Sequence, residues 1–168
     1  MKNSWFRRVA ALYDSKRKDF NWRLAADGVI HHHNGLVFDR DAYMRRIKKG
    51  GAAADKAVHA SETELSRFGF RYLGRPRPGA RLLDAGCGRG GSSVLLAKRY
   101  PGLEIRGVTL SAYQASAARA AARAAGVAGR AVFRRASMLS LPFRAASFDL
   151  VWACESTEPA QQLKSYLA

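Results

Sequence analysis

The sequence predicts an α/β fold, in which a parallel sheet carries helices on both faces and a segment of helices precedes the sheet. From residue 79 onward, short apolar runs typical of strands alternate with helical patterns, which is the order of βαβ units. Before that point, apolar residues recur at helical spacing. The stretch GRPRPGA separates the two parts, because proline and glycine interrupt helices and strands alike. With 168 residues, 48% of them hydrophobic, the chain is long enough for one domain with a buried core.

Residues 1–78 are expected to form a helical lid that also binds substrate. The stretches WFRRVAALYDSK and DKAVHASETELSRFGFRYLG have helical periodicity, and the second places Val58, Leu65, Phe68 and Tyr72 on one face of a helix. Glycine and proline then end this helix. Between the two helices, the segment DGVIHHHNGL has no clear period.

Residues 79–158 contain the alternating pattern. In chain order we expect a strand at ARLLDA, a helix at SSVLLAKRY, a strand at LEIRGVTL, a helix at SAYQASAARAAARAAG, a strand at RAVFRRA and a strand at FDLVWACE. The connections of such units are right-handed and place the strands in parallel. Residues 159–168 are expected to be a short tail.

The net charge of +16 is spread over both halves of the chain. It favours an anionic partner, which includes nucleic acid, a phosphorylated small molecule and an acidic membrane surface. The basic residues form no stripe interleaved with aromatic ones, which favours the small molecule over nucleic acid. Cys87 and Cys154 lack the spacing of a disulfide framework or a zinc site. No run is apolar enough for a membrane span or a signal peptide, so we expect a cytoplasmic protein.

Glycines follow the first expected strand directly, at the point where a strand-to-helix turn presents backbone N–H groups to a ligand. Gly86, Gly88 and Gly91 satisfy the pattern G-x-G-x-x-G, so a dinucleotide is one candidate. Two features argue against it. Asp84 precedes the first glycine, where its charge disfavours a pyrophosphate, and the second strand ends near Thr109 without the acid that grips a ribose in NAD enzymes. An amino-acid group with a positive charge would suit Asp84.

Further motifs carry a resemblance to a known family. LLDAGCGRGG resembles the first motif of S-adenosylmethionine-dependent methyltransferases with a Rossmann-like fold, and GVTLSAYQ resembles the second-strand motif of their small-molecule branch. The segments HHHNGL, YLG, ML…PF and ACEST occur in the order typical of geranyl diphosphate 2-C-methyltransferases and related prenyl diphosphate C-methyltransferases. The resemblance covers most of residues 9–158. It implies S-adenosylmethionine as the cofactor and a prenyl diphosphate of unspecified chain length as the substrate.

The resemblance also implies roles for particular residues. The glycines would let the backbone approach the methionine part of the cofactor, with the carboxylate of Asp84 near its amino group. The second-strand segment would hold the ribose, and the turn after the third strand would hold the adenine. The implied cofactor-binding residues are Asp84, Gly86, Gly88, Gly90, Thr109, Leu110, Gln114, Ser137 and Met138. At Ser137 the family commonly has Asn or Asp instead.

Glu155 in ACEST matches the acidic residue that faces the reacting alkene. Methyl transfer from a sulfonium to a C=C bond leaves a carbocation, so the site needs a water-excluding pocket and one negative group to stabilise the cation and accept a proton. Aromatic faces also attract a cation. The substrate-binding candidates are Tyr13, Trp22, His31, His32 and His33. The diphosphate is expected to bind with Mg²⁺, which uses phosphate oxygens and few protein ligands.

Two departures from the family pattern qualify these expectations. Asn34 stands after the three histidines, where the resemblance leads us to expect an aromatic residue. Enzymes of this class continue with three more strands, so we expect only the first four strands here, with an open pocket and an activity in question. Two alternatives remain: a C-methyltransferase for another lipid-like acceptor such as a sterol, tocopherol or acyl chain, and a non-catalytic basic remnant that binds nucleic acid or a protein. A homo-oligomer is also compatible with the sequence.

Overall fold

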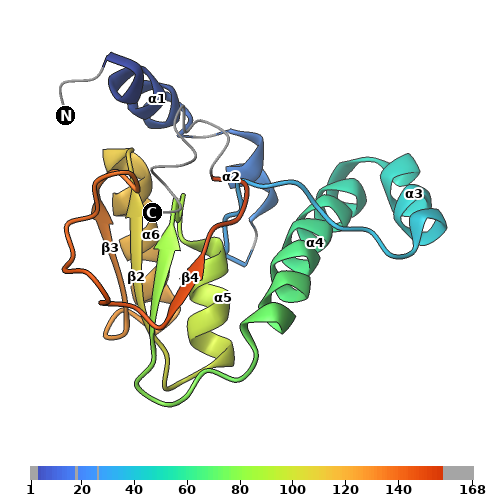
Figure 1. Ribbon diagram of the computed structural model, residues 1–168. Helices are drawn as coiled ribbons and strands as arrows, with labels where there is room; N and C mark the ends of the chain where they lie inside the picture. The colour runs from blue at the N-terminus through green and yellow to red at the C-terminus, as the bar shows by residue number, and fades with distance from the viewer. Residues whose placement is uncertain (1–3, 18, 26, 157–168) are drawn as a thin grey trace.

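The structure of the protein is a computed structural model that describes residues 4–17, 19–25 and 27–156 of the 168. A small parallel sheet with helices packed against it forms one part, and the helices of the N-terminal half lie above the sheet and to one side of it (Figure 1). The expected tail at residues 159–168 lies outside the described residues.

The sheet has four strands: β1 (Arg81–Ala85), β2 (Glu104–Thr109), β3 (Ala131–Arg135) and β4 (Leu150–Trp152). They lie in the order β3-β2-β1-β4, and every neighbouring pair is parallel. The four expected strands are thus confirmed. Because the order reverses at β1, the carboxyl ends of β1, β2 and β4 open a crevice there, which is the usual place for a ligand in such a sheet.

Helices α5 (Gly91–Arg99) and α6 (Ala112–Ala124) make the crossovers between the strands. Both pack on one face of the sheet, where the alanines of α6 allow the helix to approach closely. The main core cluster comprises residues of the sheet, of α5 and of α6, among them Leu82, Ile105, Phe133, Val94, Leu96, Ala118 and Ala122. These side chains are almost fully buried, so this face supplies most of the apolar burial that stabilises the fold.

The other face of the sheet has a thinner cover. Leu83, Ala85 and Val108 form a small cluster with side chains of the loop between β3 and β4. Val132 and Val151, which lie on strands at the two edges, are 45% and 58% exposed. Among the described residues, α5 and α6 therefore lie on one face, and a loop takes the place that the sequence had led us to expect for helices on the second face.

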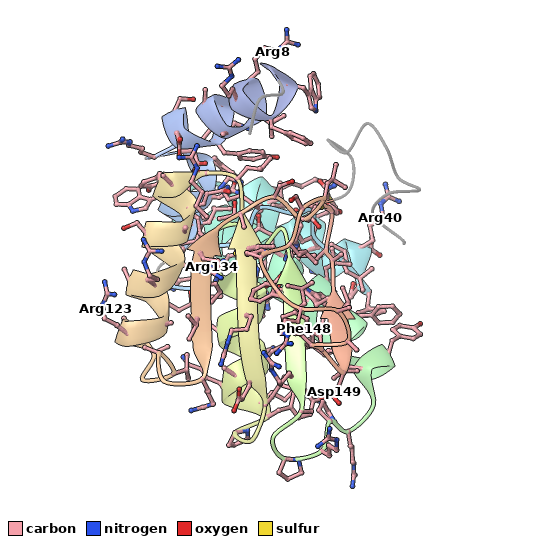
Figure 2. The ribbon with its side chains drawn as sticks, turned by 60° about the vertical axis from the view of Figure 1, so that its left-hand side comes forward. Arg8, Arg40, Arg123, Arg134, Phe148 and Asp149 are labelled. Atoms are coloured by element: carbon pink, nitrogen blue, oxygen red, sulfur yellow. The ribbon has the colours of Figure 1, made fainter. Side chains whose placement is uncertain are left out.

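Asp149 joins the beginnings of β1 and β4. Its carboxylate accepts a hydrogen bond from the Arg81 N–H at 2.8 Å and another from Arg77 Nη2 at 2.8 Å. These donors, the backbone N–H first, hold the pKa of Asp149 below its ordinary value. Figure 2 shows Asp149 at this lower end of the sheet, away from the carboxyl ends of the strands, so its contacts link the beginnings of β1 and β4.

The N-terminal half contains α1 (Ser4–Ser15), α2 (Phe20–Leu24), α3 (Arg40–Lys49), α4 (Gly51–Gly69) and the 3₁₀ helix η1 (Phe70–Leu73). The helices expected at both ends of this half are present, whereas α3 was not foreseen. It begins at Asp39, whose side chain accepts a hydrogen bond from the Ala42 N–H. Phe70 of η1 packs against Trp152 of β4 with ring centroids 5.1 Å apart, which joins this half to the sheet.

The N-terminal helices lie in two places (Figure 1). Helix α1 lies above the carboxyl ends of the strands, and α3 and α4 extend to one side of the sheet. None of the described helices is both long and apolar enough to cross a membrane.

Candidate functional site

A cavity, partly open to solvent, lies at the carboxyl ends of β1, β2 and β4. We call it the first cavity. Its walls come from the loop after β1, the ends of β2 and β4, the turn after β3, helix α1 and the segment 30–33. A second cavity, also open to solvent, lies beside it and is lined by residues of the segments 20–21, 32–37 and 43–62 and by Glu155. The two cavities share His32, His33 and Glu155.

The glycine loop, residues 86–91, forms the floor of the first cavity. Gly88 has a φ of +52°, and a β-carbon there would meet only the Cβ of His32, 3.9 Å away, so its backbone is bare toward the cavity. Gly90 differs, because a β-carbon there would lie 2.9 Å from the Cβ of Ala118. Gly90 does not line the cavity, and the structure gives it the role of letting α6 pack against the loop, instead of the ligand contact that we expected.

Asp84 lies at the end of β1 and lines the first cavity, as expected. Its side chain is 3% exposed, and its Oδ2 accepts a hydrogen bond from Ser93 Oγ at 2.6 Å. Burial raises the pKa of Asp84 to about 7, and the Ser93 hydroxyl only partly opposes this. A buried carboxylate without a cation beside it is well suited to a ligand that brings a positive charge.

Residues at the ends of β2 and β3 form one side of the first cavity. Thr109 Oγ1 donates a hydrogen bond to Gln114 Oε1 at 2.7 Å, which holds the amide of Gln114 against the strand end. Ser111 begins α6 by accepting the Gln114 N–H. Leu110, Ser137 and Met138 also line the cavity, and Ser137 is 7% exposed. The structure thus brings together the expected residues of the second and third strand motifs.

Helix α1 covers the first cavity with Phe6, Val9 and Tyr13. Asp14 anchors this helix to α6, because its Oδ1 accepts hydrogen bonds from Ser111 Oγ at 2.5 Å and from the Tyr113 N–H at 3.0 Å. The hydroxyl of Ser111 is the first cause that lowers the pKa of Asp14.

A second anchor starts from the glycine loop. The fully buried guanidinium of Arg89 contacts the Asp19 carboxylate at 2.7 Å and also donates to the carbonyl of Lys16. Tyr113 adds a contact, since its hydroxyl donates to the carbonyl of Arg17 at 2.8 Å. Residues between α1 and α2 therefore contact both the glycine loop and α6, although the sequence pointed to neither anchor.

The three consecutive histidines all line the first cavity. His31 is 2% exposed, its Nε2 lies 3.2 Å from Thr63 Oγ1, and burial lowers its pKa to about 3. Burial, and then the charge of Arg89, lowers the pKa of His32 to about 4. His33 Nε2 lies 3.0 Å from Ser66 Oγ. His31 and His32 are therefore neutral near pH 7 and can only donate or accept hydrogen bonds there.

Glu155 follows β4 and lies where the two cavities meet. Its side chain is exposed, and both carboxylate oxygens accept hydrogen bonds from Asn34: the backbone N–H at 2.9 Å and the side-chain Nδ2 at 3.0 and 3.1 Å. Tyr13 lines the first cavity, with its ring edge-on to His32. Trp22 lines neither cavity and is 50% exposed, so the structure does not bring it to the site.

The thiols near the first cavity are not suited to act as nucleophiles. Burial raises the pKa of Cys87 well above its ordinary value and that of Cys154 to about 12. Both cysteines are free. Among the described residues no group of three or more His, Cys, Asp or Glu side chains is arranged to hold a metal ion.

This geometry agrees with comparisons to known proteins. Residues 82–168 match the family model described as a methyltransferase domain, and this range includes the glycine loop and Glu155. The chain belongs to this methyltransferase family. Geranyl diphosphate 2-C-methyltransferase of Saccharopolyspora erythraea is 35% identical to this methyltransferase chain over an alignment of 156 residues, and the alignment covers 89% of the chain and 53% of that enzyme. The tocopherol O-methyltransferase of Arabidopsis thaliana is 36% identical over 76% of the chain and 36% of its own length.

Solved structures of methyltransferases are similar to the whole described fold. A geranyl diphosphate C-methyltransferase from Streptomyces coelicolor A3(2), in complex with Mg²⁺, geranyl diphosphate and S-adenosyl-L-homocysteine, superposes with a TM-score of 0.82 at 30% identity. It covers 98% of this methyltransferase chain and 58% of its own. The Rossmann-like fold of the family is thereby confirmed. The chain spans about half the length of the geranyl diphosphate methyltransferases that it matches.

Proposed function

We propose that this chain binds S-adenosylmethionine in the first cavity and methylates an alkene carbon of a prenyl diphosphate, such as geranyl diphosphate, held in the second cavity. The observation that carries the proposal is the place of Glu155, at the junction of a cavity floored by the glycine loop and a second cavity lined by both polar and apolar side chains. The similarity to geranyl diphosphate C-methyltransferases supports the same reaction class.

The first cavity fits the proposed cofactor. Bare backbone at Gly88 leaves room for a close ligand, and the buried carboxylate of Asp84 suits the ammonium of its methionine part. Gln114 and Ser137 offer an amide and a hydroxyl to the nucleoside. S-adenosylmethionine would supply an electrophilic methyl group. Helix α1, anchored through Asp14, would keep water from the reacting atoms.

The second cavity fits an amphipathic acceptor. Phe20, Val37, Tyr43 and Val58 give it apolar and aromatic walls for a prenyl chain. When a methyl group bonds to one alkene carbon, the neighbouring carbon becomes a cation, and loss of a proton restores the double bond. Glu155 is placed to stabilise that cation and accept the proton. Tyr13 also lines the first cavity and could offer its ring face to the cation.

The diphosphate end of the acceptor needs polar partners. Asn21, His32 and His33 line the second cavity and offer hydrogen bonds. Mg²⁺ would bind mainly through the phosphate oxygens.

The proposal is tested by incubating the chain with S-adenosylmethionine labelled in its methyl group, Mg²⁺ and, separately, geranyl, farnesyl and isopentenyl diphosphate. We expect label in one of these prenyl products and none in a tocopherol or sterol acceptor. Label only in a tocopherol or sterol would contradict the diphosphate substrate. An absence of label with every acceptor, from a folded chain that binds the cofactor, would contradict the activity of this chain.

A further inference from the structure

We propose that Asn34 is a positioning residue that holds the carboxylate of Glu155 at the junction of the two cavities, in the place where the family resemblance leads one to expect an aromatic side chain. This inference rests on the proposed function and concerns the same site. The proton acceptor Glu155 would thus be oriented by a residue of the N-terminal part of the chain, 121 positions away in sequence.

The contact between the two residues engages the whole carboxylate. Glu155 Oε2 accepts from the Asn34 backbone N–H at 2.9 Å and from Nδ2 at 3.0 Å, while Oε1 accepts from Nδ2 at 3.1 Å. A carboxylate offers about four acceptor positions, so these three contacts orient it and still leave a position for the proton. Donation from two directions also fixes the plane of the carboxylate relative to both cavities.

The segment that carries Asn34 is itself held in place. His33, the preceding residue, hydrogen bonds through Nε2 with Ser66 Oγ, which in turn lies 3.0 Å from Ser92 Oγ of α5. On the other side, the Leu36 N–H donates to the carbonyl of Ser61 at 2.9 Å. Asn34 is thus supported from α4 and α5, and its donors have a defined direction.

The backbone of Glu155 is equally constrained. Its φ is +46°, a left-handed conformation that is unfavourable for a residue with a side chain and costs about 1 to 3 kcal/mol. The next residue, Ser156, donates from Oγ to the carbonyl of Ala85 at 2.6 Å, which holds the segment against the end of β1. A strained residue at the rim of two cavities, met by two directed donors, has the character of a functional arrangement rather than a solvated surface acid.

The chemistry of the proposed reaction gives this arrangement a purpose. A carboxylate already oriented before a cation forms needs no reorganisation as the charge develops. Asparagine supplies an N–H donor that stays uncharged at every pH, whereas an aromatic side chain at this position would supply a face for the cation and no amide donor. With Asn34 at this position, the chain lacks one aromatic side chain and gains two donors that orient the carboxylate of Glu155.

Two measurements test the inference together. Hydrogen exchange of the Asn34 amides is followed by ¹⁵N NMR in the parent chain and in Glu155→Ala, and we expect exchange at least about tenfold slower in the parent. Single-turnover methyl transfer is compared in the parent, Asn34→Ala and Asn34→Asp. We expect a loss of about a hundredfold for Asn34→Asp, which opposes two like charges, and a smaller loss for Asn34→Ala, which keeps the backbone donor.

A positioning role lowers the transfer rate and leaves the KM for the acceptor and the affinity for S-adenosylhomocysteine within about twofold. Ser116→Asp, which adds the same charge on an exposed position of α6 outside both cavities, is the matched control and should behave as the parent. Melting temperatures show whether each variant is folded. If Asn34→Asp does not fold, the transfer rate of Asn34→Ala alone is compared with that of the parent.

The outcomes separate this inference from the proposed function. Equal exchange in the parent and Glu155→Ala, or equal transfer rates in the parent and both Asn34 variants, would overturn the role of Asn34 while leaving the methyltransferase proposal intact. Slow exchange in a parent that methylates no acceptor would contradict the proposed function, and with it the purpose assigned to the contact.

Discussion

Ser93 Oγ donates a hydrogen bond to Asp84 Oδ2 at 2.6 Å beneath the floor of the first cavity, and both side chains are buried. Ser93 lies in the first turn of α5, and Asp84 is the second-last residue of β1. Their hydrogen bond therefore links the strand and the helix on either side of the glycine loop. Because one hydrogen bond does not compensate for burial, the pKa of Asp84 is raised to about 7. A ligand that brings a positive charge next to Asp84 would stabilise its ionised form.

Binding of S-adenosylhomocysteine is therefore expected to depend on pH through Asp84. The ammonium of the ligand favours the ionised carboxylate of Asp84, whose pKa is about 7. The affinity for S-adenosylhomocysteine should therefore be about tenfold higher at pH 8 than at pH 6. Calorimetric titrations across this range measure the effect. In Asp84→Asn the affinity should be weaker and flat with pH; an equally steep profile in that variant would assign the dependence to another group.

His59 should make the stability of the fold depend on pH as well. The nearby carboxylates raise its pKa: first that of Glu62, with Oε2 3.7 Å from Nδ1, and then that of Asp27, with Oδ1 3.0 Å from Nε2. The pKa is higher in the folded state, so this stabilisation is complete below the unfolded value of 6.5 and is lost as the pH rises through the folded value.

The melting temperature of the parent should fall by about 3 °C more between about pH 6 and pH 8 than that of His59→Gln. The neighbouring His31 does not titrate in this range, because burial keeps its pKa near 3. Parallel curves for the parent and His59→Gln would show that the charge of His59 does not contribute.

Three glycine variants should separate ligand contact from packing. Gly88 and Gly126 both have positive φ values, +52° and +68°, and neither position would clash with a β-carbon, so alanine at each should cost about 1 kcal/mol of stability. Only Gly88 lines the first cavity, so Gly88→Ala should also weaken binding of S-adenosylhomocysteine at least about tenfold, while Gly126→Ala should not.

Gly90→Ala should show the opposite balance, since its β-carbon would press on Ala118 rather than on a ligand. We expect a larger loss of stability, about 2 kcal/mol or more, measured by urea unfolding. If Gly90→Ala were as stable as Gly126→Ala, the packing role that the structure gives to Gly90 would be incorrect.

Asp14→Ala should loosen the cover of the first cavity. It removes the acceptor for Ser111 and for the Tyr113 N–H, and hydrogen bonds to a charged group contribute about 1.5 to 3 kcal/mol. We expect faster hydrogen exchange in α1 and dissociation of S-adenosylhomocysteine accelerated about tenfold in stopped-flow measurements. An unchanged dissociation rate would mean that α1 does not control release of the ligand.

The sequence was sufficient to predict what depends on local patterns. The strand that carries Asp84, the glycine loop and the helix that carries Gln114 are all encoded by neighbours in the chain, and the structure places these parts at one cavity. The contact between Asn34 and Glu155 had no such signal, because the two residues are 121 positions apart and meet only once the N-terminal half packs against the sheet, as Phe70 of η1 does against Trp152 of β4. Trp22 shows the reverse error: an aromatic residue in the lid segment was a reasonable candidate, but its helix leaves it outside both cavities.

A calorimetric titration of S-adenosylhomocysteine into the folded chain, with NAD as the competing candidate, tests the central claim most directly. The account predicts one site of about micromolar affinity for S-adenosylhomocysteine, strongly weakened in Gly88→Ala, and no comparable binding of NAD. A folded chain that bound neither ligand, or that bound NAD more tightly, would contradict the assignment of the first cavity to the methyl donor.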